Sequence, residues 1–155
     1  MVSNALRDAG RLRLTVGVVF GLAAATLLGV LASRGWLRRP RVWAVLGLAG
    51  AAYAAAIWPM NSPEEKVHFV EYGLVGVLAF FAAPVRLEGF RRFAAAALFT
   101  AAAGWLDEGI QALLPSRYYD LRDVGFNAAA GVFALLALAG MRAAVRADAT
   151  PQSVA

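Results

Sequence analysis

Residues 124–141 read VGFNAAAGVFALLALAGM, a stretch of small and apolar residues without a charged side chain. An α-helix needs about 20 such residues to cross the hydrocarbon core of a bilayer. Four other, mostly apolar stretches approach or reach this length, at residues 14–32, 42–60, 67–85 and 93–114. Short segments with Pro, Arg or Asn join them, as is typical of turns. The sequence therefore predicts an all-α fold, a polytopic transmembrane bundle of about five helices, in a single membrane domain over residues 1–155.

The composition of the whole chain supports a membrane setting. Of the 155 residues, 61% are hydrophobic and 16% are charged, whereas a soluble domain is about half apolar and a quarter charged. The net charge of +5 comes from Arg residues in short runs between the apolar stretches, as the positive-inside rule predicts. No nucleic-acid partner is therefore expected. The sequence has no Cys, which excludes disulfides, thiolate metal sites and Cys nucleophiles.

The first apolar stretch, residues 14–32, raises two questions: whether it is a signal peptide or a retained helix, and whether its small residues form a packing ridge. It is longer than the roughly 7–15 residues of a secretory signal peptide's apolar core, so we expect a retained helix. It also carries a ridge of small residues at spacing four, namely Gly17, Gly21, Ala25 and Gly29. Such a ridge suits close contact between helices in lipid, but a composition rich in Ala and Gly produces it equally well.

The distribution of Lys and Arg predicts the orientation in the membrane. With five spans, the first and third connections and the tail lie on one side, and they hold nine Lys and Arg. The other side, with the N-terminus and the second and fourth connections, holds six. Because the more basic side faces the cytoplasm, the second and fourth connections are expected to face outward. Three Arg before the first stretch favour the opposite orientation.

Carboxylates gather on the face opposite to most of the Arg residues. In an antiparallel bundle, the start of the third stretch, the end of the fourth and the start of the fifth share one membrane face. That face holds seven carboxylates and three Lys and Arg, while the other holds two carboxylates and nine Arg. The residues of this predicted polar cluster are Lys66, His68, Glu71, Tyr72, Asp107, Glu108, Gln111, Arg117, Asp120, Asp123 and Asn127.

The depth at which Glu71 and Asp107 are expected to lie in the membrane indicates where their side chains point. Glu71 and Asp107 lie more than a helical turn inside their apolar stretches. A charge that faces hydrocarbon costs at least about 2.5 kcal/mol, so we expect both side chains to point into the bundle. Residues three or four apart share a helix face. Such pairs in the cluster are His68–Glu71, His68–Tyr72, Asp107–Gln111 and Asp123–Asn127.

The cluster has several chemical interpretations. His68, Glu71, Asp107 and Glu108 are the candidate catalytic residues, because carboxylates and imidazole act as general acids and bases. A structural network of ion pairs and hydrogen bonds is the alternative. Carboxylates with Asn127 could also ligate Mg²⁺ or Ca²⁺, but no spacing is typical of a metal motif, so neither a metal nor a cofactor is predicted. The candidate ligand-binding residues are Lys66, Tyr72, Gln111, Arg117, Asp120, Asp123 and Asn127.

At these residues the chain resembles the VanZ-like family of bacterial integral membrane proteins. The matching region covers about residues 64–135, and the order and spacing of its pieces carry the resemblance. The family more often has Asp at the position of Glu65. The matching residues are Glu65-Lys66-Val67-His68-Phe69 with Tyr72, Asp107-Glu108 with Gln111, and then Pro115, Arg117, Asp120, Asp123, Asn127 and Gly131.

The resemblance implies a multi-pass protein of the bacterial cytoplasmic membrane with a role in the cell envelope. The founding member is associated with low-level resistance to teicoplanin, a glycopeptide that acts on cell-wall precursors outside the membrane. We therefore expect the cluster to bind a lipid headgroup or a lipid-linked cell-wall component, with the bilayer and such a precursor, or the glycopeptide, as partners. The alternatives are an intramembrane acid/base enzyme that modifies a lipid headgroup and a non-catalytic scaffold. The sequence assigns no oligomeric state.

Overall fold

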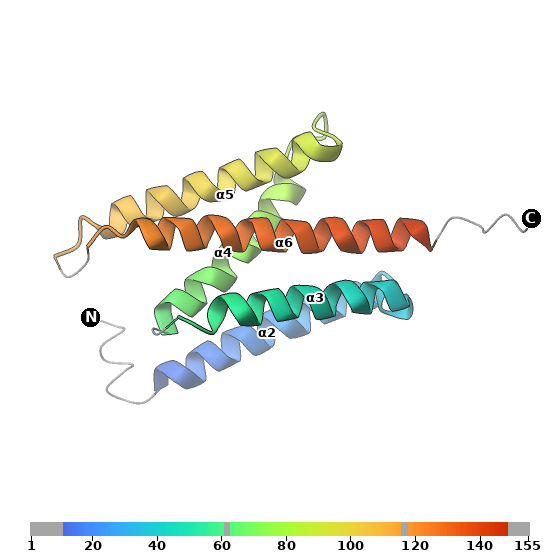
Figure 1. The fold of residues 1–155 in the computed structure, drawn as a ribbon, viewed down its shortest axis with the longest axis horizontal. Helices are drawn as coiled ribbons and strands as arrows, with labels where there is room; N and C mark the ends of the chain where they lie inside the picture. Colours follow the sequence, from blue (N-terminus) through green and yellow to red (C-terminus); the bar gives the residue numbers. More distant parts are fainter. Residues whose placement is uncertain (1–10, 61–62, 116–117, 149–155) are drawn as a thin grey trace, which may run out of the picture.

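The computed structural model describes residues 11–60, 63–115 and 118–148, and these ranges form helices joined by short connections (Figure 1). The prediction of an all-α fold with five long helices is confirmed for this part of the chain, which contains no strand. The elements in chain order are α2 (Arg11–Ser33), the short 3-10 helix η1 (Trp36–Arg38), α3 (Pro40–Ile57), α4 (Pro63–Ala82), α5 (Gly89–Gln111) and α6 (Leu121–Ala147).

Local chemistry explains where the helices begin and end. Pro40 stands at the start of α3, where its missing N–H has no intrahelical partner to lose. The predicted stretch 42–60 ran too far, because α3 ends at Ile57. Trp58 still has helical backbone angles and donates to the carbonyl of Ala54, but Pro59 has no N–H with which to continue the helix. At α6 the side chain of Asp120 accepts a hydrogen bond from the backbone N–H of Arg122 at 2.8 Å, which caps the helix.

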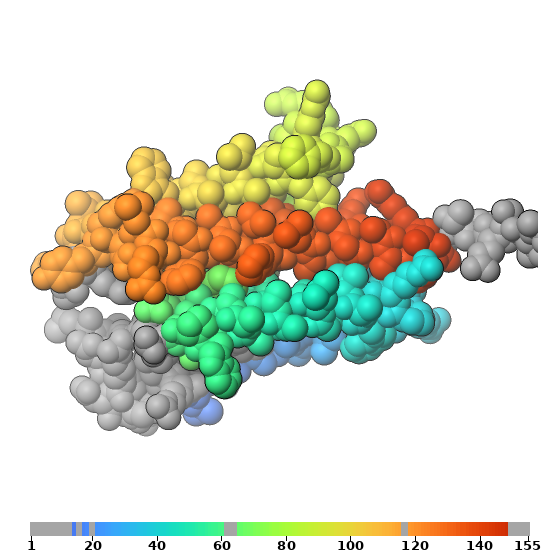
Figure 2. Space-filling view, in the orientation of Figure 1, coloured from blue at the N-terminus to red at the C-terminus, as the bar shows by residue number. Residues whose placement is uncertain are grey.

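Helix α6 is the axis of the fold. It contacts α3, α4 and α5, and α4 crosses behind it at a steep angle (Figure 1). The space-filling view shows α6 lying between α5 on one side and α3 on the other (Figure 2). Three small clusters of buried apolar residues follow its length, and each includes α6 side chains. Helices α3, α4 and α5 are therefore positioned mainly by what they bury against α6.

Glycines let α4, α5 and α6 approach closely. A Cβ atom on Gly76 of α4 would lie 3.1 Å from the Cα atom of Gly131 in α6. A Cβ atom on Gly131 would in turn lie 2.6 Å from Cγ2 of Thr100 in α5. By contrast, Cβ atoms on Gly17 or Gly21 of α2 would meet nothing within 4 Å among the described residues. The small-residue ridge predicted on the first stretch is thus not used for packing within this part of the chain.

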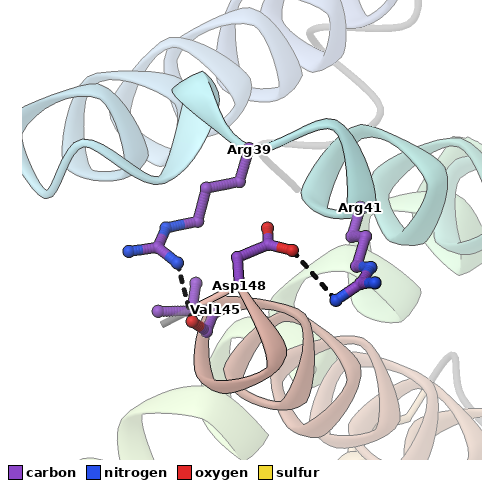
Figure 3. A network of polar contacts seen from close by, with 4 residues as sticks. All are labelled: Arg39, Arg41, Val145 and Asp148. Carbon is purple, nitrogen blue, oxygen red and sulfur yellow. Dashed lines mark hydrogen bonds and ion pairs between the residues drawn. The ribbon is translucent and has the colours of Figure 1, made fainter. Parts of the chain in front are cut away.

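The helices alternate in direction, so the chain has two chemically different ends. The start of α4, the end of α5 and the start of α6 lie at one end, which we call the acidic end (left in Figure 1). The end of α4 and the start of α5 lie with the end of α6 at the other, which we call the arginine end. There, Nη1 of Arg39 donates to the carbonyl oxygen of Val145 at 2.7 Å, and Arg41 pairs with Asp148 at 3.0 Å (Figure 3).

Every long helix exposes large apolar side chains. Leu22, Leu48, Leu78, Leu98 and Leu136 represent α2 to α6, and each is more than half exposed. Apolar side chains are thus exposed along all five long helices, which is more than scattered single residues. Among the helices that the structure describes, two, α3 and α6, are long and apolar enough to cross a membrane. Charged residues occupy the ends of α4 and α5, which shortens their uninterrupted apolar runs.

Candidate functional site

Glu108 is the most buried carboxylate that the structure describes. It lies one turn before the end of α5 with only 3% of its surface exposed. Its Oε1 accepts a hydrogen bond from the backbone N–H of Asp120 at 3.0 Å. Glu108 therefore ties the end of α5 to the residue that caps α6.

Asp107 and Gln111 form a second polar pair on the same helix. The Nε2 atom of Gln111 donates to Oδ2 of Asp107 at 2.9 Å, and both residues are half-buried. The four-residue spacing predicted this contact, because such residues are neighbours on a helix surface. The bond fixes the direction of the Asp107 carboxylate and leaves its second oxygen available to another donor.

Tyr72 brings α4 to this site. The side chain is buried, and its hydroxyl donates to the carbonyl oxygen of Ala103 at 3.5 Å. The Asp107 carboxylate also lies within hydrogen-bonding and electrostatic range of this hydroxyl, and Glu71 and Glu108 lie within electrostatic range. A phenol in this position can donate to a carboxylate or to a ligand oxygen.

Asn127 brings α6 to the same place and has an unusual feature. It is only 2% exposed, and its Nδ2 finds no hydrogen-bond acceptor among the described residues. A Cβ atom on Gly104 of α5 would lie 2.8 Å from Cβ of Asn127 and 3.3 Å from the ring of Tyr72. The Asn127 side chain therefore lies where α4, α5 and α6 meet. A buried donor without an acceptor is rare and costs free energy.

The structure brings some of the predicted site residues into contact with one another. It gathers Tyr72, Asp107, Glu108, Gln111 and Asn127, with the backbone of Asp120 beside them. We call these five side chains the polar site. Lys66, His68 and Asp123 are half-buried near the ends of their helices, and no hydrogen bond joins the His68 imidazole to another described residue. Arg117 lies outside the described residues.

The prediction that Glu71 points into the bundle is wrong. Its side chain is exposed, whereas its neighbour Tyr72 is buried. Consecutive helix residues point about 100° apart, so only one of the two can face α6. The buried face of α4 includes Phe69, Tyr72, Gly76 and Phe80, and Glu71 lies off this face.

The sequence reasoning missed two polar side chains near the site. Tyr53 of α3 donates its hydroxyl to the carbonyl oxygen of Ala130 at 3.0 Å, and its ring packs edge-on against Phe69. Thr100 of α5 is fully buried and donates to the carbonyl oxygen of Ala96 at 2.8 Å. A signal was present for Tyr53, which is the only hydroxyl-bearing residue of α3.

The donor set of the site also bears on metal binding. Among the described residues, no group of three or more His, Cys, Asp or Glu side chains is arranged to hold a metal ion. Of the carboxylates considered as metal ligands, Glu71 is exposed, Asp107 is half-buried and Glu108 is buried.

No protein-family model, no curated protein and no solved structure matches this chain. The assignment of the polar site therefore rests on the burial, contacts and hydrogen bonds of its own residues.

Proposed function

We propose that this chain is a VanZ-like, multi-pass protein of the bacterial cytoplasmic membrane, and that its polar site binds the headgroup of a lipid-linked cell-wall component. The membrane setting is supported by the exposure of α3, which is apolar yet mostly unburied. The core helix of a soluble protein would be mostly buried. Helices α4 and α5, with 20 and 23 residues, are about 30–35 Å long and match a hydrocarbon core of about 30 Å.

The charges at the two ends support one orientation. The arginine end is the basic end and is assigned to the cytoplasm by the positive-inside rule. The acidic end then faces outward, where cell-wall precursors complete their assembly. The polar site lies near that end, so a headgroup in the outer leaflet could approach it from the membrane surface.

The chemistry of the polar site favours a neutral, hydroxyl-rich or amide-rich headgroup. Carboxylates accept hydrogen bonds from hydroxyl and amide groups, and the Asn127 amide donates to a carbonyl or hydroxyl oxygen. Asp107 and Glu108 would repel a phosphate placed directly between them. A sugar or peptide portion therefore suits the site itself, while the half-buried Lys66 at the start of α4 offers a positive charge for a phosphate.

The observation that carries this proposal is the buried Nδ2 of Asn127 without an acceptor. If Asn127 served only stability, an isosteric apolar side chain would perform better, because it removes the desolvation penalty of the amide. A buried donor without an acceptor needs an explanation, and a bound ligand that supplies the acceptor provides one.

Asn127→Leu tests the proposal with two readouts. We expect the purified variant to unfold at the same or a higher temperature than the parent protein, because an unpaired buried amide is removed. We also expect its affinity for a polyprenyl diphosphate-linked disaccharide peptide to fall about tenfold, which corresponds to about 1.4 kcal/mol. Thermal unfolding in detergent and native mass spectrometry with titrated lipid measure the two effects.

Thr100→Val is the matched control, since it removes a buried hydroxyl that already has its own acceptor outside the polar site. Its affinity for the precursor is expected to stay unchanged. Loss of stability with unchanged binding in Asn127→Leu would contradict the proposal and favour a scaffold. A change in the mass of the precursor during incubation would indicate the intramembrane enzyme instead. The link to glycopeptides is tested by expressing the chain in a susceptible bacterium and measuring survival in teicoplanin.

A further inference from the structure

A second polar region lies at the arginine end and plays no part in the proposed function. A pocket of about 580 Å³ opens there between the end of α4, the start of α5 and the end of α6. Its charged lining consists of Arg92, Arg142, Arg146 and Glu88. Three cations thus face one carboxylate, and the remaining lining is mainly aromatic and aliphatic. This combination distinguishes the pocket from the polar site, where carboxylates prevail.

Arg92 holds the wall of the pocket in place. Its Nε donates to the carbonyl oxygen of Phe80 at 2.9 Å, and its Nη2 donates to the carbonyls of Phe81 at 3.2 Å and Ala83 at 3.3 Å. The carbonyls of Phe80 and Phe81 belong to the last turn of α4 and have no partner within the helix, and Ala83 directly follows the helix. Arg92 therefore closes the end of α4 and anchors the start of α5 against it.

Arg142 has no comparable partner among the described residues. It is half-buried, and its guanidinium lies 5.3 Å from the ring centroid of Phe80. The Arg92 guanidinium lies 5.0 Å from the same centroid, so the two cations are held within about 10 Å of each other by one ring. Each is attracted to the ring face, yet they repel each other. An anion in the pocket would offset that repulsion and accept hydrogen bonds from the planar donors of Arg142.

The rest of the lining favours a lipid over a soluble anion. Phe90 and Val85 are strongly exposed on the rim, at 84% and 86% of their surface. Helix α5 begins at Gly89 on the wall, and the Glu88 side chain does not cap it, so its first N–H groups add positive character beside the arginines. Basic pockets between helices on the cytoplasmic side suit anionic lipid headgroups, and apolar residues on the rim suit the adjoining acyl chains.

We propose that this pocket binds the phosphate headgroup of an anionic phospholipid through Arg142, with Arg92 and Arg146 contributing charge and with the acyl chains against Phe90 and Val85. The inference rests on the membrane setting of the proposed function but not on any ligand of the polar site. The simpler reading is that these arginines only set topology, in which case any anionic lipid would associate weakly and without dependence on Arg142.

The test is native mass spectrometry of the full chain in detergent, titrated with phosphatidylglycerol or phosphatidylcholine. We expect the parent protein to retain phosphatidylglycerol in preference to phosphatidylcholine, and Arg142→Gln to lower the phosphatidylglycerol affinity at least tenfold. Arg122→Gln is the matched control, because the Arg122 guanidinium also stacks on a Phe ring, at 5.8 Å from the centroid of Phe126, but at the acidic end. Its affinity for phosphatidylglycerol is expected to match that of the parent.

Four further results decide between these readings. Equal loss in Arg142→Gln and Arg122→Gln would overturn the proposal, because it would show a response to net charge alone. Displacement of the lipid by inorganic phosphate at similar concentration would assign the pocket to a soluble anion and overturn the lipid assignment. Arg142→Lys, which keeps the charge and loses the planar fork, is expected to bind with intermediate affinity and to unfold like the parent.

Asn127→Leu is expected to bind phosphatidylglycerol normally. Failure of the lipid proposal at the arginine end is therefore distinguishable from failure of the proposed function at the acidic end.

Discussion

The two ends of the bundle satisfy their polar groups in opposite ways. At the acidic end, Glu108 and Asn127 are buried and face other helices. At the arginine end, the long side chains of Arg39 and Arg92 reach the last carbonyls of α6 and α4 from outside. A short carboxylate can be satisfied inside a bundle only by donors that the backbone brings to it, whereas Arg can extend to its acceptors. The acidic end therefore depends on close helix packing, and the arginine end depends on it much less.

The largest expected effect on stability comes from disrupting the close contact between α5 and α6 at Gly131. Gly131→Val would press a side chain into Thr100, where even a Cβ atom lies at 2.6 Å, and we expect it to lower the free energy of unfolding by roughly 3 kcal/mol. Gly125→Val on the same helix meets nothing within 4 Å among the described residues and should change stability by only a few tenths of a kcal/mol. Thermal or denaturant unfolding in micelles compares the two. Similar losses for both variants would show that the close contact is not what matters.

A smaller effect is expected from the hydrogen bond that joins α5 to α6. Glu108→Ala leaves the backbone N–H of Asp120 without its acceptor, which costs about 1–3 kcal/mol for a buried group. Glu108→Gln keeps an acceptor oxygen and should retain most of that stability. Glu71→Gln, which changes an exposed carboxylate, is the control and should leave unfolding unchanged. If Glu71→Gln destabilised the protein as much as Glu108→Ala, the distinction between buried and exposed carboxylates at the acidic end would be wrong.

The smallest effect on stability is expected from an exposed ion pair at the arginine end. Arg41 and Asp148 pair at 3.0 Å, but their side chains are 58% and 24% exposed. A double-mutant cycle with Arg41→Gln and Asp148→Asn is expected to give a coupling of at most about 0.5 kcal/mol, because water screens an exposed pair. The coupling should also fall on addition of salt. A coupling of several kcal/mol that salt does not alter would show that this end is more tightly built than its exposure indicates.

Properties that depend on neighbours in sequence were predictable. The apolar lengths indicated the five long helices, and the spacing of Asp107 and Gln111 indicated their hydrogen bond. The helix ends were less accurate where Pro59 interrupts an apolar run, since hydrophobicity continues across a residue that the helix does not tolerate.

Properties that depend on how the helices rotate and cross were not predictable. Glu71 and Tyr72 are adjacent, and only the crossing of α4 over α6 decides which of them is buried. Tyr53 reaches Ala130 across 77 residues of sequence, and no local pattern indicates that distance. The same holds for the pocket at the arginine end, which α4, α5 and α6 line together.

The sequence by itself determined the helical class, the approximate extent of the helices and the separation of carboxylates from arginines. These follow from hydrophobicity and charge, which each residue carries wherever it is placed. Only the tertiary structure decided that the Asn127 amide is buried without an acceptor, that Glu71 faces outward, and that Arg92 and Arg142 share the Phe80 ring. Burial and contact arise between helices, and a linear pattern does not specify the angle at which two helices meet.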